Sequence, residues 1–173
     1  ATAIGTSINA PKGYAEVASK ALAEVSGIPV VLSTNLIEAT WDTGAYVQTS
    51  GVLKRIAVKL SKICNDLRLL SSGPRTGINE INLPRLQPGS SIMPGKVNPV
   101  VPDMLSQIGL KVGANHAGIA HAACGGGLEC GCDASMIRRA FHESAEMLAR
   151  GIPLFVSKVI EGTQPGESLR DSW

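Results

Sequence analysis

The residues best suited to chemistry lie in the segment from Gly89 to Pro99, which reads GSSIMPGKVNP. Two adjacent serines, a lysine and an asparagine stand there among glycines and prolines. Backbone N–H groups in such a loop, together with a lysine, favour an anionic ligand such as a carboxylate or a phosphate. A P-loop is excluded because five residues separate Gly89 from Gly95, where a P-loop has four, and because Val97 replaces the required hydroxyl. The Gly-x-Ser-x-Gly pattern of a nucleophile elbow is also absent. The alternative to an anion site is a flexible surface loop.

A long helix is predicted on the N-terminal side of this loop, from about Thr43 to Ser71. Its apolar residues recur at steps of three and four, which is typical of a helix that buries one stripe. The stripe consists of Leu53, Ile56, Ala57, Leu60, Ile63, Cys64, Leu67 and Leu70. So long a pattern indicates a bundle of long helices.

Three further helices are predicted, over residues 14–26, 99–123 and 134–160, with an extended stretch at 28–32. We expect a kink or a break at Pro153, because proline lacks the N–H that a helix interior needs. Glycines in the second of these helices permit close approach of a neighbouring helix; they are Gly109, Gly113 and Gly118. The dense glycines and prolines of residues 73–99 predict a long loop, which at that length is functional or disordered.

The composition excludes several classes of protein. The chain has 173 residues, of which 44% are apolar, 17% charged and 3% aromatic, with a net charge of +2. This apolar fraction excludes disorder of the whole chain. A membrane span is not predicted either, because the sequence has no run of about 18 apolar residues. No basic stripe suggests nucleic acid as a partner. Few aromatic residues favour close-packed helices over an aromatic-rich β-sandwich. Residues 1–6 carry no secretory signal pattern, and we expect a cytoplasmic protein.

The cysteines and histidines offer a second site to consider. Cys64 lies within the predicted stripe and is interpreted as a small buried hydrophobe. A possible metal site combines His121, Cys124, Cys130 and Cys132 in a glycine-rich stretch. Their spacing matches no usual structural zinc pattern, so reduced incidental thiols are the favoured interpretation and no metal is expected. Three histidines are interpreted as surface or packing residues; they are His116, His121 and His142.

The segment Gly89–Pro99 resembles the signature of the aspartase/fumarase superfamily in its full form. The similarity extends over most of residues 1–120, including 3–9 and 61–75. Three other segments resemble the aspartate ammonia-lyase branch of the superfamily rather than the fumarase branch; they are residues 35–40, 44–47 and 79–84.

This resemblance implies an all-α fold, the long-helix bundle of the superfamily's central domain with a long catalytic loop at residues 85–99. It implies that the N-terminal and C-terminal domains of the family are absent from this chain. The implied reaction is a reversible anti β-elimination of ammonia from L-aspartate, which gives fumarate without a cofactor. The implied ligand is a small dicarboxylate, and the intact enzyme is expected to be a homotetramer without nucleic-acid or membrane partners.

The resemblance also assigns roles to residues of the loop. It implies that Ser90, in its deprotonated form, is the base that removes a proton from the carbon next to a carboxylate. It implies that Ser91, Lys96 and Asn98 contact substrate carboxylates. Loop N–H groups and Lys96 supply positive potential for the alkoxide and for the extra negative charge that proton removal creates. Closure of the loop over substrate is the expected gating step.

Several departures from the family pattern leave alternatives open. Asp103 stands where the family has a glutamate that pairs with an active-site histidine, and we expect this shorter side chain only to support the site. His116 replaces an expected aspartate, and residues 126–132 differ from the family segment. Family active sites combine segments of three subunits, of which this chain holds one. We therefore expect no turnover by the chain alone; the alternatives are a fumarate hydratase or a non-catalytic, self-associating helical fragment.

Overall fold

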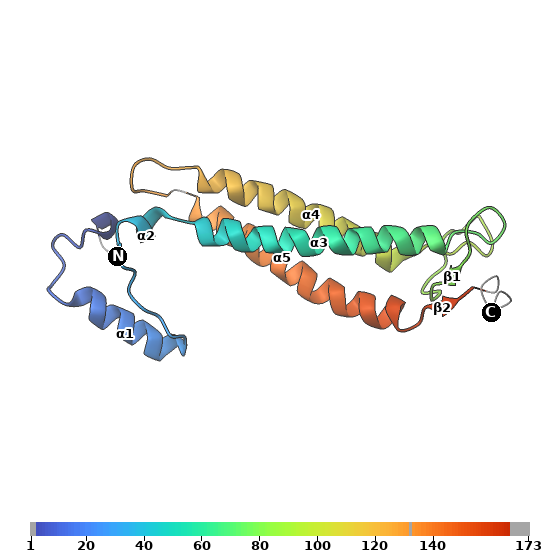
Figure 1. The fold of residues 1–173 in the computed structure, drawn as a ribbon, viewed down its shortest axis with the longest axis horizontal. Coiled ribbons are helices and arrows are strands. Elements are labelled where there is room, and N and C mark those ends of the chain that lie inside the picture. The colour runs from blue at the N-terminus through green and yellow to red at the C-terminus, as the bar shows by residue number, and fades with distance from the viewer. Residues whose placement is uncertain (1–2, 132, 167–173) are drawn as a thin grey trace.

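The computed structural model describes residues 3–131 and 133–166. Three long helices lie side by side along most of its length: α3 (Gly44–Leu70), α4 (Val100–Ala123) and α5 (Ala134–Phe155) (Figure 1). The smaller elements are η1 (Ala3–Gly5), α1 (Tyr14–Ser26), α2 (Glu38–Trp41), η2 (Val156–Ile160), β1 (Ile81–Asn82) and β2 (Gln164–Pro165). The described residues thus confirm the predicted all-α bundle. None of their helices has the length and hydropathy needed to cross a membrane.

The local sequence signals predict most helix ends to within one residue of the observed ends. Helix α1 has the predicted bounds, and it ends where Gly27 adopts a left-handed conformation with φ of 67°. There the Gly27 N–H donates to the carbonyl of Ala23 at 3.0 Å, which caps the last turn. Helices α3 and α4 each begin one residue later than expected. Residues 28–32, expected to be extended, form neither helix nor strand.

We expected a kink or a break at Pro153; the last helix continues through it to Phe155, so a break does not occur there. Instead, the chain changes to a wider π-helical turn, η2, which starts at Val156. Pro153 and Ala149 are both exposed, so the carbonyl that loses its N–H partner to proline lies on the solvent side. Solvent can therefore reach this carbonyl, and the helix continues.

Buried apolar side chains form three clusters along the bundle. The loop-end cluster consists of Cys64, Val101, Leu105, Phe155 and Val159. The middle cluster consists of Ala57, Val112 and Leu148, and the far-end cluster of Ile119, Ile137 and Ala140. Cys64 is fully buried, as predicted, and this desolvation raises the pKa of its thiol.

The apolar stripe of α3 is wider than the surface that α4 and α5 cover. Ala57 and Cys64 are buried against these two helices, and Leu60 packs beside them. Ile56 and Ile63, by contrast, keep 40% and 39% of their surface exposed. Helices α4 and α5 therefore cover only the inner half of the stripe.

Two of the three predicted close approaches at glycines occur. A Cβ added at Gly109 would collide with the Ser61 hydroxyl and lie 3.3 Å from the carbonyl of Ala57, so α4 meets α3 closely there. At Gly118 an added Cβ would lie 2.8 Å from the Met136 methyl group. At Gly113 nothing lies within 4 Å of an added Cβ, so no neighbouring helix uses the space that this glycine leaves.

Replacing Gly113 with alanine is expected to raise the free energy of unfolding by about 0.5–1 kcal/mol, because alanine is the better helix former and meets no neighbour. Gly109→Ala is the matched variant in the same helix. Its gain in helix propensity is opposed by overpacking of about 1–3 kcal/mol, so we expect it to be neutral or destabilising. Urea unfolding of both variants measures the difference, and equal effects at the two sites would contradict the close contact at Gly109.

Polar side chains tie α4 to α5. The Asn115 amide lies within hydrogen-bond distance of three acceptors on α5: the Ala140 carbonyl at 3.2 Å, Glu143 Oε2 at 2.8 Å and Ser144 Oγ at 3.0 Å. The bond from Asn115, with a smaller effect of Lys111, holds the pKa of Glu143 below its ordinary value.

The three histidines lie away from the loop and fit the interpretation given from the sequence. His116 Nδ1 lies 2.9 Å from the hydroxyl of the buried Ser50, so its ring joins α4 to α3 as a packing residue. His121 and His142 are exposed on the helix surface.

Candidate active site

The long loop between α3 and α4 is attached to the bundle at its middle. Strand β1 of the loop pairs with β2, which follows the last helix, so that Ile81 lies opposite Pro165 (Figure 1). Leu83 then packs against the loop-end cluster. This glycine- and proline-rich loop therefore has a defined path, because the β1–β2 pairing and the loop-end cluster both hold it.

The signature segment forms a small closed loop at the start of α4. The Gly89 N–H donates to the Lys96 carbonyl at 2.7 Å, which joins the two sides of the loop. The Asn98 amide donates to the Gly89 carbonyl at 3.4 Å and reinforces this closure. The side chain of Asn98 is half-buried, whereas that of Lys96 is exposed. Asn98 therefore has a structural contact within the loop.

Ser90 lies inside this small loop with its hydroxyl oxygen held by two backbone donors. The N–H groups of Ile92 and Met93 donate to Ser90 Oγ at 3.1 Å and 3.2 Å. Both lone pairs of the oxygen are then occupied, so the hydroxyl proton is directed elsewhere. Hydrogen bonds donated to an oxygen favour negative charge on it. The arrangement thus suits an alkoxide, the form that a serine base needs.

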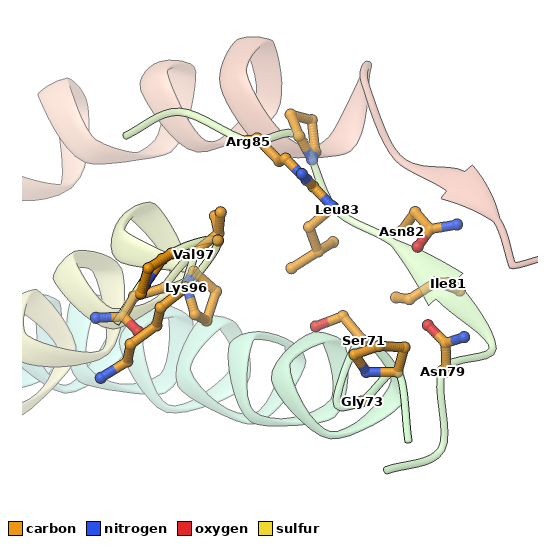
Figure 2. Close-up of a pocket in the computed structure, with 15 residues that line it drawn as sticks. Ser71, Gly73, Asn79, Ile81, Asn82, Leu83, Arg85, Lys96 and Val97 are labelled. Atoms are coloured by element: carbon orange, nitrogen blue, oxygen red, sulfur yellow. The ribbon is translucent and has the colours of Figure 1, made fainter. Parts of the chain in front are cut away.

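Two neighbouring clefts meet at the signature segment. The larger cleft has a volume of about 500 Å³ and lies between residues 71–85 and 94–99 (Figure 2). The smaller cleft, of about 430 Å³, lies between residues 85–90 and 93–97. Their shared lining consists of Arg85, Pro94, Gly95, Lys96 and Val97.

The structure brings together some of the predicted site residues and separates one of them. Ser90 and Lys96 line the smaller cleft, and Lys96 and Asn98 line the larger one. Ser91 is exposed and lines neither. Sequence reasoning had not singled out Asn82 and Arg85, which also line the larger cleft. They precede the signature segment, and only the folding of the loop back on itself places them beside it.

The charge of the clefts favours an anion. Lys96 forms no ion pair within the described part of the chain. The lining of both clefts includes Lys96 and Arg85 but no aspartate or glutamate. A carboxylate entering either cleft therefore meets positive charge without a competing acid.

Asp103 lies in the first turn of α4, next to the signature segment. Its carboxylate forms an ion pair with Arg68 of α3, and Arg68 also donates to the side-chain oxygen of Asn65. The backbone N–H of Asp103 donates to the Pro99 carbonyl at 3.1 Å. Within this chain Asp103 thus joins the start of α4 to α3, which supports the end of the signature segment.

The cysteine-rich stretch lies at the opposite end of the bundle, between α4 and α5 (Figure 1). Cys124 and Cys130 are exposed free thiols, and Cys132 lies outside the described residues. Among residues 3–131 and 133–166, no three His, Cys, Asp or Glu side chains gather as metal ligands would. The described residues of this stretch line neither of the two clefts.

Comparison with known proteins places these features in a family. The sequence model of the family described as Lyase matches residues 1–113. A protein from Helicobacter pylori named aspartate ammonia-lyase is 54% identical over 168 residues, 97% of this chain and 36% of its own length. One of the same name from Escherichia coli strain K12 is 55% identical over 173 residues, 100% of this chain and 36% of its own. The chain thus spans about a third of these curated relatives.

Solved structures agree with this assignment. A fumarate lyase:delta crystallin from Brucella melitensis, bound to cobalt, has a TM-score of 0.88 at 49% identity and matches 95% of this chain, which covers 36% of that protein. A class II fumarase from Schistosoma mansoni has a TM-score of 0.88 at 31% identity, with 95% and 37% of the two chains covered. The resemblance inferred from residues 89–99 is confirmed. The chain belongs to the Lyase family.

Proposed function

We propose that the natural protein containing this chain is an aspartate ammonia-lyase, which converts L-aspartate reversibly into fumarate and ammonia. The observation that carries the proposal is Ser90, whose oxygen accepts two backbone N–H bonds in a cleft that also holds Lys96. Relatives of this name are about 54% identical to the chain, which supports ammonia rather than water as the leaving group.

In the proposed reaction, the Ser90 alkoxide takes a proton from the carbon next to one carboxylate. The electron pair of that C–H bond enters this carboxylate and then forms the C=C bond, while the C–N bond on the opposite face breaks and ammonia leaves. Lys96, Asn98 and Ser91 bind the substrate carboxylates. Positive charge at Lys96 stabilises the doubly charged intermediate more than the substrate, which lowers the barrier. No electrons pass to an acceptor, so we propose no cofactor.

We further propose that residues 1–173 are part of the central helical-bundle domain, with residues 85–99 as the catalytic loop. Asp103 supports that loop through its pairing with Arg68. We propose a cytoplasmic homotetramer that acts on a small dicarboxylate. The exposed apolar side chains on the outer surface of the bundle, including Ile56, Ile63 and Leu110, support burial between subunits.

The test is an assay of the purified natural full-length gene product for fumarate and ammonia formed from L-aspartate. Equal amounts of the two products support the proposal. Consumption of malate without consumption of aspartate would instead identify a fumarate hydratase, and activity on neither compound would contradict a lyase of this type. For the 173-residue chain alone we expect no turnover, because catalysis needs partner groups positioned by other segments.

A further inference from the structure

An ion pair joins the two ends of the long loop that carries the candidate site. The loop leaves α3 after Leu70 and enters α4 at Val100. Arg68, in the last turn of α3, pairs with Asp103, in the first turn of α4. Among the described residues this is the ion pair that connects these two helices; the others lie within one helix or connect α4 to α5. The pair therefore closes the base of the loop.

Each partner of the pair is also bonded to the adjacent end of the loop. The Ser71 hydroxyl donates to the Arg68 carbonyl at 3.3 Å. The Asp103 N–H donates to the Pro99 carbonyl at 3.1 Å. Ser71 and Pro99 are the first and the last residues of the chain that line the larger cleft. The distance between Arg68 and Asp103 therefore determines how far apart the two walls of this cleft stand at their base.

The guanidinium group of Arg68 is held in one orientation by two acceptors. Its Nη1 donates to Asp103 Oδ1, and its Nη2 donates to the side-chain oxygen of Asn65. The two charged side chains are partly covered, with 35% and 39% of their surface exposed, and the neighbouring Leu67 and Met104 pack against the loop-end cluster. Water and salt therefore screen this pair less than they screen an ion pair on the open helix surface.

The start of α4 depends on this pair because it lacks a capping side chain. Its N-cap residue is Pro99, which makes no side-chain hydrogen bond to the first turn. The first N–H groups of a helix have no partner within it, and helix ends open at little cost in free energy. Asp103 is the acidic residue of this turn, and Arg68 ties it to α3. Lys96 and Asn98 lie shortly before the cap, so opening of this turn would displace both.

We propose that Arg68 is a positioning residue for the proposed reaction. Through Asp103 it fixes the first turn of α4, and with it the geometry between the signature segment and the opposite wall of the cleft. This geometry affects the rate because a misplacement of about 1 Å can slow a reaction about a hundredfold. The inference rests on the proposed function for the reaction whose rate it affects.

The experiment compares Arg68→Gln with the wild-type full-length gene product. We expect kcat for fumarate formation from aspartate to fall at least about tenfold, whereas KM should rise less than about threefold because Lys96 and Asn98 are retained. Arg68→Lys keeps a positive charge opposite Asp103 and should restore kcat to within about threefold of wild type. In an Asp103→Asn background, Arg68→Gln should lower kcat by less than about twofold further, because its partner is already lost.

Lys111→Gln is the matched control, because it removes another partly exposed ion pair between helices, the pair of Lys111 with Glu143 of α5. Its kcat should stay within about twofold of wild type, and urea unfolding compares the stability of the two variants. If Arg68→Gln lowers kcat no more than Lys111→Gln does, the role of Arg68 is merely structural and the proposal is overturned. An equal loss from Arg68→Gln in the wild-type and Asp103→Asn backgrounds would also overturn it.

Hydrogen exchange decides independently of the reaction. Peptides that cover residues 86–104 should exchange about three- to tenfold faster in Arg68→Gln and at the wild-type rate in Lys111→Gln. Unchanged exchange in Arg68→Gln would overturn the proposal. If the wild type forms no fumarate, the proposed function fails, and exchange alone decides whether Arg68 holds the signature segment. If Arg68→Gln does not fold, Asp103→Asn removes the same ion pair and takes its place in the exchange measurement.

Discussion

Ser90→Ala is expected to lower kcat for fumarate formation by about a thousandfold or more in the full-length gene product, with KM changed by less than about threefold. The alanine removes the proposed base, and a positioned base contributes about 10²–10⁴-fold to a rate. Substrate binding remains because Lys96 and Asn98 are retained. Steady-state measurement of fumarate at several aspartate concentrations separates the two constants.

The effect on stability should be small, which distinguishes a catalytic role of Ser90 from a structural one. The substitution frees the N–H groups of Ile92 and Met93, but both residues are exposed, so water replaces the lost bonds. We expect a loss of at most about 1 kcal/mol in the free energy of unfolding. Ser135→Ala, an exposed serine at the far end of the bundle, is the control and should keep full activity. More than a tenth of wild-type kcat in Ser90→Ala would contradict Ser90 as the base.

Leu105→Ala is expected to lower the free energy of unfolding of this chain by about 3–4 kcal/mol. Leu105 is 1% exposed and belongs to the loop-end cluster, where α3, α4 and α5 meet. Removing a buried leucine loses its transfer free energy and leaves a cavity, which together cost about 2–5 kcal/mol. Urea unfolding followed by circular dichroism gives the value, provided that the m-value is unchanged.

Leu110→Ala provides a control in the same helix with the same change of side chain. Leu110 is 76% exposed in this chain, so the substitution should alter the free energy of unfolding by less than about 0.5 kcal/mol. Equal losses at the two positions would contradict the orientation of α4. Because Leu83 packs against the same cluster as Leu105, the cavity should also loosen the loop that carries Arg85.

The helices could be predicted because their signals are local. Gly27 and Pro29 end α1, and the apolar steps of three and four along α3 require no knowledge of what covers them. The same local reasoning was insufficient at Pro153, since whether a proline breaks a helix depends on whether water reaches the carbonyl that it leaves unpaired. It was also insufficient at Gly113, which meets no neighbour, while Gly109 of the same helix meets α3.

The properties of the candidate site also fall into those that the sequence predicts and those that depend on the tertiary structure. The signature residues, their order and the position of the loop before a helix are properties of the sequence, and so is the family resemblance that they carry. Only the tertiary structure decided that Ser90 shares a cleft with Lys96 while Ser91 does not. It also decided that Asp103 pairs with Arg68, and that Arg85 lies beside the signature segment. The pairing of Asp103 with Arg68 and that of β1 with β2 join segments far apart in the chain, and neither periodicity nor turn chemistry encodes such contacts.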